Sequence, residues 1–284
     1  MANVKTVRRR IPGVTKIKQI TRAMKMVATV KYRRTASLLF NSRPFALKIR
    51  EMVSDLQSSL DRERFSHVLF EKRPVEKRLF IVIGTDRGFC GSFNSNLCKK
   101  VLEETKNHPG ETNLLLIGKK TRSFFRKSGL PVYDAILNLN EKMYADFAGE
   151  VSVRLIEDFR DGKFDEITVF YNEFKSVLQT RIRQEKLIPV SLEMPAQNKA
   201  EYIYEPVLPE ILSVLLPRYI VSQFYIFLLE SKAAEEAGRM NTMDLAAKNA
   251  DDLLEELKMA FNKARQWTIT RELADISVVV EAMS

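Results

Sequence analysis

The sequence predicts an α/β protein, in which a long antiparallel coiled coil of N- and C-terminal helices is joined to a Rossmann-like α/β domain. Apolar residues recur in steps of three and four at both ends of the chain, the spacing of one helical face. Between these ends, short β-branched runs ending in glycine alternate with helical stretches. We therefore expect a coiled-coil helix over residues 1–75, an α/β domain over 76–205 and a second coiled-coil helix over 206–284.

The N-terminal segment is expected to form one long helix. Its apolar face comprises Val4, Val7, Ile11, Val14, Ile17, Ile20, Met24 and Val27. Pro12-Gly13 predicts a kink, or a helix that begins near Pro12, because proline lacks an amide donor and glycine costs about 1 kcal/mol inside a helix. Arg43-Pro44 predicts a second bend. Roughly fifty helical residues would span about 75 Å, so this narrow face needs a partner helix.

The middle of the chain predicts a parallel or mixed sheet covered by helices. Short apolar runs predict strands over residues 78–85, 112–117, 132–137, 166–171, 177–183 and 202–204. Helices are expected over residues 94–107, 119–127 and 144–160. This alternation is typical of a layered α/β domain.

The C-terminal segment is expected to be helical from Pro209, with one interruption at Pro217 and a one-residue slip of its apolar face near Trp267. From Glu230 onward it holds 11 acidic and 7 basic residues, whereas residues 1–50 hold 14 basic residues and no acidic ones. Opposite charge and matched apolar faces predict that the two ends pair with one another. A domain inserted between them makes that pairing antiparallel.

Composition excludes several classes of protein. The chain of 284 residues is 45% hydrophobic with only ten glycines and ten prolines, which excludes collagen-like and low-complexity proteins. Two cysteines, Cys90 and Cys98, cannot form a disulfide framework, and we expect small packed residues there. We find no run of roughly 18 apolar residues that would predict a membrane span, and no secretory signal.

The net charge of +10 leaves a second interpretation open, a basic coiled-coil protein that binds nucleic acid. Its positive charge lies in the N-terminal segment, since the other 234 residues hold 32 basic and 36 acidic side chains. Base-stacking aromatics are sparse there, and no nucleic-acid-binding module is visible. The same positively charged segment could instead bind an acidic protein surface or an anionic lipid.

The turn after the first predicted strand, Thr85-Asp-Arg-Gly-Phe-Cys-Gly-Ser-Phe-Asn94, is the candidate for a ligand site. It lies where α/β sheets often hold ligands, and Asp86, Arg87 and Asn94 could reach one. The alternative is a turn whose polar groups serve the local backbone. No phosphate loop or dinucleotide fingerprint is present, and His67 and His108 lack metal-site spacing. We expect no catalytic site, no cofactor and no metal.

Three stretches carry a specific resemblance to a known family. Ile20-Thr-Arg-Ala-Met-Lys-Met-Val27 resembles the N-terminal signature of the ATP synthase gamma subunit, and the Thr85–Asn94 turn resembles that family's turn after its first strand. Residues 237–273, which include Ala-Gly-Arg-Met-Asn-Thr-Met243 and Asn262-Lys-Ala-Arg-Gln266, resemble its C-terminal signature. The resemblance covers nearly the whole chain.

This resemblance implies a rotating central stalk of a proton-translocating ATP synthase, with no catalytic site of its own. The coiled coil would run through a head of alpha and beta subunits. The α/β domain would form a foot that meets the epsilon subunit and the membrane ring of c subunits. The expected location is the cytoplasmic face of a bacterial inner membrane, peripherally and in one copy per complex, with the mitochondrial matrix side as the alternative.

The resemblance also implies contact residues. Met24, Lys25, Arg239, Gln266 and Thr270 are expected to face the beta subunits. Tyr202 and Glu205 are expected to lie near the c ring and epsilon.

The last two turns of the chain are apolar on every side. A helix of this kind is normally buried, and its own partner helix can cover only one side. We therefore expect a surrounding apolar sleeve, with a frayed terminus as the alternative.

Overall fold

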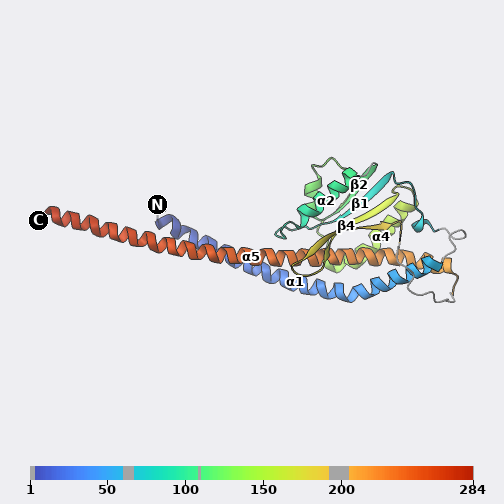
Figure 1. Cartoon of the computed structure of the whole chain (residues 1–284), viewed down its shortest axis with the longest axis horizontal. Helices are drawn as coiled ribbons and strands as arrows, with labels where there is room; N and C mark the ends of the chain where they lie inside the picture. The colour runs from blue at the N-terminus through green and yellow to red at the C-terminus, as the bar shows by residue number, and fades with distance from the viewer. Residues whose placement is uncertain (1–3, 60–66, 108–109, 192–204, 284) are drawn as a thin grey trace. The chain divides into compact units, whose positions relative to one another are not determined.

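The computed structural model describes residues 4–59, 67–107, 110–191 and 205–283 (Figure 1). The helices are α1 (Val4–Ser59), α2 (Phe93–Asn107), α3 (Lys119–Phe125), α4 (Tyr144–Arg160) and α5 (Leu208–Met283), with short 3-10 turns η1 (Val68–Phe70) and η2 (Glu141–Met143). The strands are β1 (Lys77–Ile83), β2 (Glu111–Ile117), β3 (Val132–Ile136), β4 (Glu166–Phe174) and β5 (Thr180–Ile188).

The chain divides into two compact units. Unit 1 comprises Met1–Thr29 with Met240–Ser284, and unit 2 comprises Val30–Arg239. Both α1 and α5 contribute residues to each unit. These units are defined by contacts in space, whereas the three segments expected from the sequence are defined by the residue pattern along the chain.

Unit 2 is built on one sheet, whose described strands lie in the order β3-β2-β1-β4-β5. The pairs β1·β2, β1·β4 and β2·β3 are parallel, and β5 joins β4 in antiparallel fashion. The parallel strands place their carboxyl ends on one edge, beside the turn after β1. This mixed sheet with covering helices confirms the predicted Rossmann-like domain.

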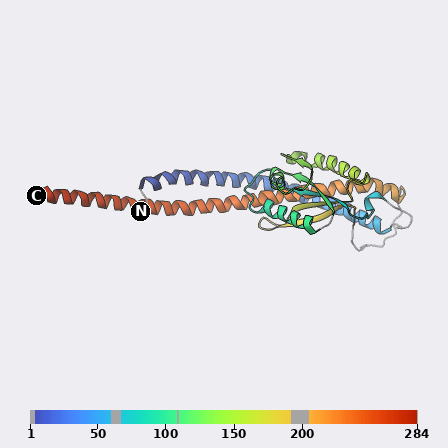
Figure 2. The ribbon, with the colours of Figure 1, turned by 90° about the horizontal axis from the view of Figure 1, so that it is seen from above.

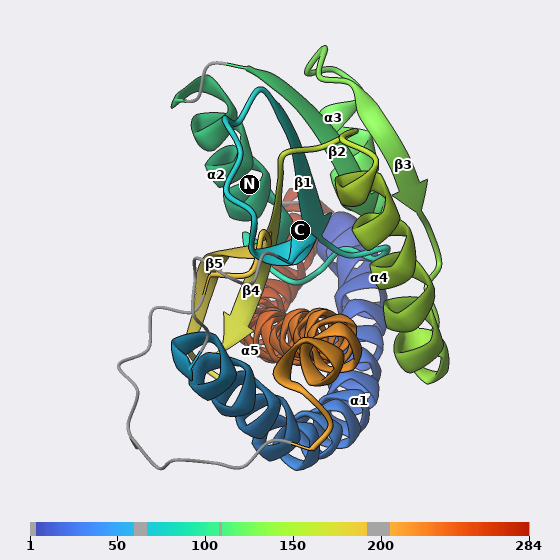
Figure 3. The ribbon, with the colours of Figure 1, turned by 90° about the vertical axis from the view of Figure 1, so that its right-hand side faces the viewer.

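Alternate side chains of the central strands enter different cores, because successive residues of a strand point to opposite faces. Phe80 and Val82 of β1 pack with α2 and α3, whereas Leu79, Ile81 and Ile83 pack with α1, α4 and α5. Figure 3 shows α2 and α4 on opposite sides of the sheet, with α5 lying along the α4 side. The unit is therefore a layered α/β fold in which a long helix closes one face.

Unit 1 is an antiparallel pair of helices. Lys18 and Arg22 of α1 bond to Asp251 of α5, while Lys25 bonds to Asp244, so higher numbers on one helix meet lower numbers on the other. Figure 2 shows the two helices side by side. The apolar face predicted for α5 is buried at Met243, Ala247, Ala250 and Leu254, whereas its continuation at Leu273, Ile276 and Val280 is 60–63% exposed within this chain.

The seam of α1 agrees with its prediction at Val7, which is buried, and differs from it further along the helix. Thr21 and Ala28 are buried, whereas the larger Ile17, Ile20 and Val27 are 55–59% exposed. Small side chains let two helices approach closely, which large ones would prevent. The large apolar residues of α1 consequently line an outer surface.

The prolines do not end the helices. Of the two outcomes predicted for Pro12-Gly13, a kink or a helix start, the start is wrong, because α1 begins at Val4 and continues through Pro12-Gly13 and Pro44. Likewise α5 continues through Pro217 and past Trp267. Each proline removes one backbone hydrogen bond, but tertiary packing of a long helix outweighs a local breaker.

By length and composition, α5 contains one stretch that could cross a membrane, an 18-residue window of mean hydropathy 1.6 within Leu208–Ala274. Its existence corrects the sequence-based expectation that no stretch qualifies. Half of the window is buried inside the protein. Leu212, Leu216, Ile220 and Phe224 lie in the core against the sheet, as in the central helix of a globular domain.

The last two expected strands, over residues 177–183 and 202–204, are not found as predicted among the described residues. The final strand runs over Thr180–Ile188, further along the chain than the expected 177–183, because residues 175–179 form the turn that returns the chain antiparallel to β4. The strand expected over 202–204 lies outside the described residues.

Candidate functional site: the paired helices and the turn after β1

Two of the predicted contact residues lie on α1 in unit 1. Met24 is half-buried in the helix pair. Lys25 donates to Asp244 Oδ1 at 2.6 Å. That hydrogen bond, against a smaller opposing effect of burial, lowers the pKa of Asp244. Lys25 thus has a partner within the chain while its side chain stays 42% exposed, enough to meet a second one.

Gln266 and Thr270 lie one helical turn apart on α5, and both are exposed. The Thr270 hydroxyl donates to the Gln266 backbone carbonyl at 2.9 Å. The Gln266 side chain therefore presents its amide to the surroundings, where it can both donate and accept hydrogen bonds.

Arg239 differs from the other predicted beta-subunit contact residues, because it is only 7% exposed. Its guanidinium lies against Glu235 at 2.5 Å and Glu236 at 2.6 Å. Its Nε donates to the Gly88 carbonyl at 3.3 Å. The donor fork expected to reach a partner protein is engaged within unit 2, where it joins α5 to the turn after β1.

Lys232 completes a buried charge cluster with Glu235, Glu236 and Arg239. Its ammonium lies 2.9 Å from Glu235 and 3.1 Å from Glu236. Burial would lower the pKa of Lys232, but the nearby carboxylates outweigh it and raise the pKa. For Glu236, burial opposes ionisation, while Lys232 and Arg239 together lower the pKa. Lys232 and Glu236 are therefore each favoured in the charged form by their partners in the cluster.

The polar groups of the turn after β1 serve the local backbone. Asp86 Oδ1 accepts from the amides of Lys119 and Asn138, at 3.0 and 3.1 Å. Asn94 Oδ1 accepts from the Thr85 amide at 3.1 Å. Of the two interpretations of this turn, the geometry favours the bracing role, with Arg87 left exposed.

A close backbone approach fixes this edge of the sheet. Gly118 has φ of +101°, and a Cβ there would lie 2.7 Å from the backbone of Thr85. Only glycine fits such a contact without strain. The loops after β1 and β2 are thus held together.

A polar opening of about 330 Å³ lies at the carboxyl edge of β1 and β2. Its lining includes Lys31, Arg87, Tyr144 and the acidic members of the charge cluster. The cluster carboxylates are paired with cations, and Asp86 is engaged by backbone amides. These groups form no nucleophile–base pair and no phosphate cradle.

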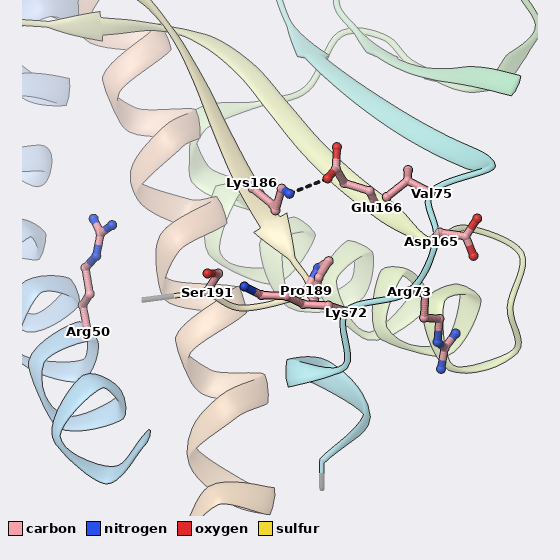
Figure 4. A pocket seen from close by; sticks show the side chains of 9 residues that line it. All are labelled: Arg50, Lys72, Arg73, Val75, Asp165, Glu166, Lys186, Pro189 and Ser191. Atoms are coloured by element: carbon pink, nitrogen blue, oxygen red, sulfur yellow. Dashed lines mark ion pairs between the residues drawn. The ribbon is translucent and has the colours of Figure 1, made fainter. Parts of the chain in front are cut away.

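A second opening, of about 540 Å³, lies at the opposite edge of the sheet (Figure 4). Figure 4 shows Lys186 of β5 directed at Glu166 of β4, an ion pair of 2.5 Å. Arg73 donates to the Phe159 carbonyl and to Glu71, and Asp165 accepts from the amides of Glu76 and Lys77. Most of the charged side chains described at this opening therefore bond to other parts of the fold.

Glu205, expected near the c ring, is exposed just before α5. Tyr202 lies outside the described residues, so its expected position stays a prediction.

The two cysteines are buried and unpaired, which confirms their prediction as packed residues. Burial raises the pKa of Cys98 to about 12 and also raises that of Cys90. His67 accepts from the Leu69 amide, and burial lowers its pKa. His108 lies outside the described residues. Over the part of the chain that the structure describes, no group of three or more His, Cys, Asp or Glu side chains could hold a metal ion.

Sequence comparison matches the chain end to end with one family. A family model described as ATP synthase matches residues 3–283. The ATP synthase gamma chain of Chlorobium phaeobacteroides is 37% identical over 293 residues, covering 100% of this chain and 99% of that protein. The gamma chain of Desulforamulus reducens is 36% identical over 282 residues, covering 97% of each.

Solved structures show the same similarity. A chain of the central stalk and c-ring of Tetrahymena thermophila mitochondrial ATP synthase has a TM-score of 0.59 at 28% identity, covering 80% of this chain and 99% of that one. A chain from the Euglena gracilis mitochondrial ATP synthase, in a structure of OSCP, F1 and c-ring, has a TM-score of 0.67 at 19% identity. It covers 99% of this chain and 94% of that one, and at this identity it shows the fold alone.

Proposed function

This chain belongs to the ATP synthase family as a gamma chain, and from that premise we propose how it works as the rotating central stalk of a proton-translocating enzyme. The observation that carries its function is the end-to-end match with gamma chains, over 100% of the chain. The subunit is a non-catalytic part of the complex. The comparisons give no support to the nucleic-acid-binding alternative.

The proposed partners are the alpha and beta subunits of the catalytic head, the epsilon subunit and the c ring, with one gamma chain per complex. Support comes from the similar structures, whose names include a central stalk with c-ring and an F1 with c-ring. Membrane association would be peripheral, through the complex. The proposed location is the cytoplasmic face of a bacterial inner membrane, in keeping with the bacterial relatives.

We propose that the paired helices of unit 1 meet the beta subunits through Met24, Lys25, Gln266 and Thr270. The exposure of Gln266 and Thr270, and the 42% exposed side chain of Lys25, support this assignment. The family resemblance implies that Arg239 is also one of these contact residues. Since its guanidinium is held within the chain, its proposed contribution is to fix the turn after β1. Glu205 and Tyr202 are proposed to lie near the c ring.

The proposed mechanism is a shift of populations. A shaft with unlike faces contacts the three beta subunits differently at each angle, so each orientation stabilises a different set of open and closed states. Here α1 is basic and α5 is acidic over its C-terminal half, so the faces differ in charge. Rotation driven by the c ring would then change which beta subunit binds, converts or releases nucleotide.

The test is reconstitution. The chain is expressed with alpha and beta subunits from a bacterial ATP synthase, and the purified complex is assayed for ATP hydrolysis. We expect a stable complex with one copy of this chain, crosslinkable from a cysteine at Gln266 to a beta subunit. A head that assembles and turns over ATP equally well without the chain would contradict the proposal.

A further inference from the structure

Three elements of unit 2 meet at the last residue of β4. Arg43 of α1 bonds to Glu230 of α5 through Nη2 at 2.6 Å and Nε at 3.1 Å, both to Oε1. The other carboxylate oxygen of Glu230 accepts from the Phe174 amide at 2.7 Å. Arg43 Nη2 also donates to the Phe174 carbonyl at 3.1 Å. Each element is therefore bonded directly to the other two.

This contact is enclosed on the side of Glu230 and Phe174, whereas the Arg43 side chain is 33% exposed. The Glu230 side chain is 7% exposed, and Phe174 is buried. The ring of Tyr32, also on α1, lies 5.5 Å from the ring of Phe174. Gln223 of α5 donates to the Ala46 carbonyl of α1 at 3.2 Å nearby. A buried charge that loses its partner is strongly unfavourable, so the triad has one preferred arrangement.

Most of the contact between the long helices and the sheet is of another kind. Leu39, Ile49 and Val53 of α1, and Ile220 and Phe224 of α5, belong to the apolar core. Apolar contact is non-directional and tolerates small shifts along a helix. Arg43, by contrast, donates two charge-assisted hydrogen bonds to one oxygen of Glu230, and such directed bonds restrain both distance and angle. The triad therefore supplies directional restraint where the apolar core supplies cohesion.

We propose that Arg43 and Glu230 are positioning residues for torque transmission, which lock α1 and α5 to the sheet so that the helices and the α/β domain turn together. The inference rests on the proposed function, because it assigns this restraint a role in rotation. Neither residue belongs to the predicted contact set. The pair acts through the fold and touches no reacting group.

The test uses the complete ATP synthase in proteoliposomes, with this chain as its gamma subunit. Arg43→Lys keeps the charge but replaces the fork by a single flexible ammonium, and Glu230→Gln removes the charge at constant shape. ATP hydrolysis and ATP-driven proton uptake are measured on the same vesicles. We expect hydrolysis per assembled complex to stay near wild type, while protons taken up per ATP fall roughly threefold.

The matched control is Arg183→Lys. Arg183 pairs with Glu173 at 2.9 Å, beside the triad, but joins two strands of the sheet and no helix. We expect it to leave the uptake ratio unchanged. The inference is overturned if Arg43→Lys and Glu230→Gln pump normally per ATP, or if they only reduce the number of complexes while those that form couple normally. Wild-type chain that supports no proton uptake would overturn the proposed function itself, and this inference with it.

Discussion

At the scale of residues, burial separates two side chains that the sequence groups together. Arg239 is enclosed by Glu235, Glu236 and the Gly88 carbonyl, whereas Gln266 is exposed. Both carboxylates are visible in the sequence at helical spacing from Arg239. The approach of Gly88 is not, because it depends on how α5 lies against the turn after β1. The sequence therefore predicted that Arg239 would donate hydrogen bonds to carboxylates, but not that its acceptors lie within the same chain.

Arg239→Ala is expected to lower the free energy of unfolding of the isolated chain by about 3 kcal/mol, since it leaves two buried carboxylates with less compensation. Gln266→Ala truncates an exposed side chain and is expected to stay within about 0.5 kcal/mol of wild type. Urea unfolding followed by circular dichroism measures both. Equal transition midpoints for the two variants would show that the buried cluster contributes nothing to stability.

At the scale of elements, the ion pairs of unit 1 make the helix pair sensitive to acid. The hydrogen bond from Lys18 lowers the pKa of Asp251, against a smaller opposing effect of burial. A carboxyl whose folded pKa lies below its ordinary value of 3.8 stabilises the fold above that pH. The stabilisation is lost as the pH falls through the folded pKa.

We therefore expect faster amide exchange around Asp251 below about pH 4 than at pH 6, after correction for the intrinsic rate. Hydrogen exchange with mass spectrometry on the full chain measures this. Asp251→Asn should show the fast exchange at both pH values. Asp252→Asn, on the exposed neighbouring position, is the control and should behave like wild type.

The tip of α5 supports a second prediction at this scale. Ile276, Val280 and Met283 are 60%, 63% and 86% exposed within this chain, so the apolar sleeve that we predict around them would have to come from other subunits. Val278, Val279 and Ala282, also part of the predicted apolar tip, have side chains outside the described set. An apolar sleeve lacks directional bonds and can hold the tip while it turns.

Deleting residues 278–284 is expected to lower the thermal stability of the reconstituted complex yet leave most of its ATP turnover. Differential scanning fluorimetry and steady-state phosphate release measure the two effects. A complex that stays fully assembled but loses turnover would make the tip a coupling element rather than a bearing.

The elements themselves were largely predictable, and the misses have physical causes. Periodicity predicted both long helices because a narrow apolar face repeats over many turns. It placed Ile17 and Ile20 in the seam of α1, whereas the structure uses Thr21 and Ala28, since close helix approach favours small side chains over large apolar ones. The predictions made from Pro12 and Pro217 overestimated how strongly a proline interrupts a helix. Tertiary contacts along a long helix outweigh one lost hydrogen bond.

At the scale of the whole molecule, the absence of a phosphate loop from the sequence gives a simple expectation. The isolated chain should hydrolyse no ATP, because it lacks the glycine-rich loop and lysine that cradle phosphates. A phosphate-release assay on the purified chain measures this. Activity that co-elutes with the chain through two columns would contradict it.

The position of α5 has a consequence for the synthesis of the chain. The hydroxyl of Ser231 bonds to the Ile83 carbonyl of β1 across 148 residues of sequence, in the core where α5 closes one face of the sheet. At about 5–20 residues per second, a ribosome needs roughly 7–30 s to make that intervening chain. During this time the strands exist while their apolar face is still uncovered. The core is therefore completed, and α1 fully paired, only after α5 has been made, and a chaperone that shelters the open sheet would act within this interval.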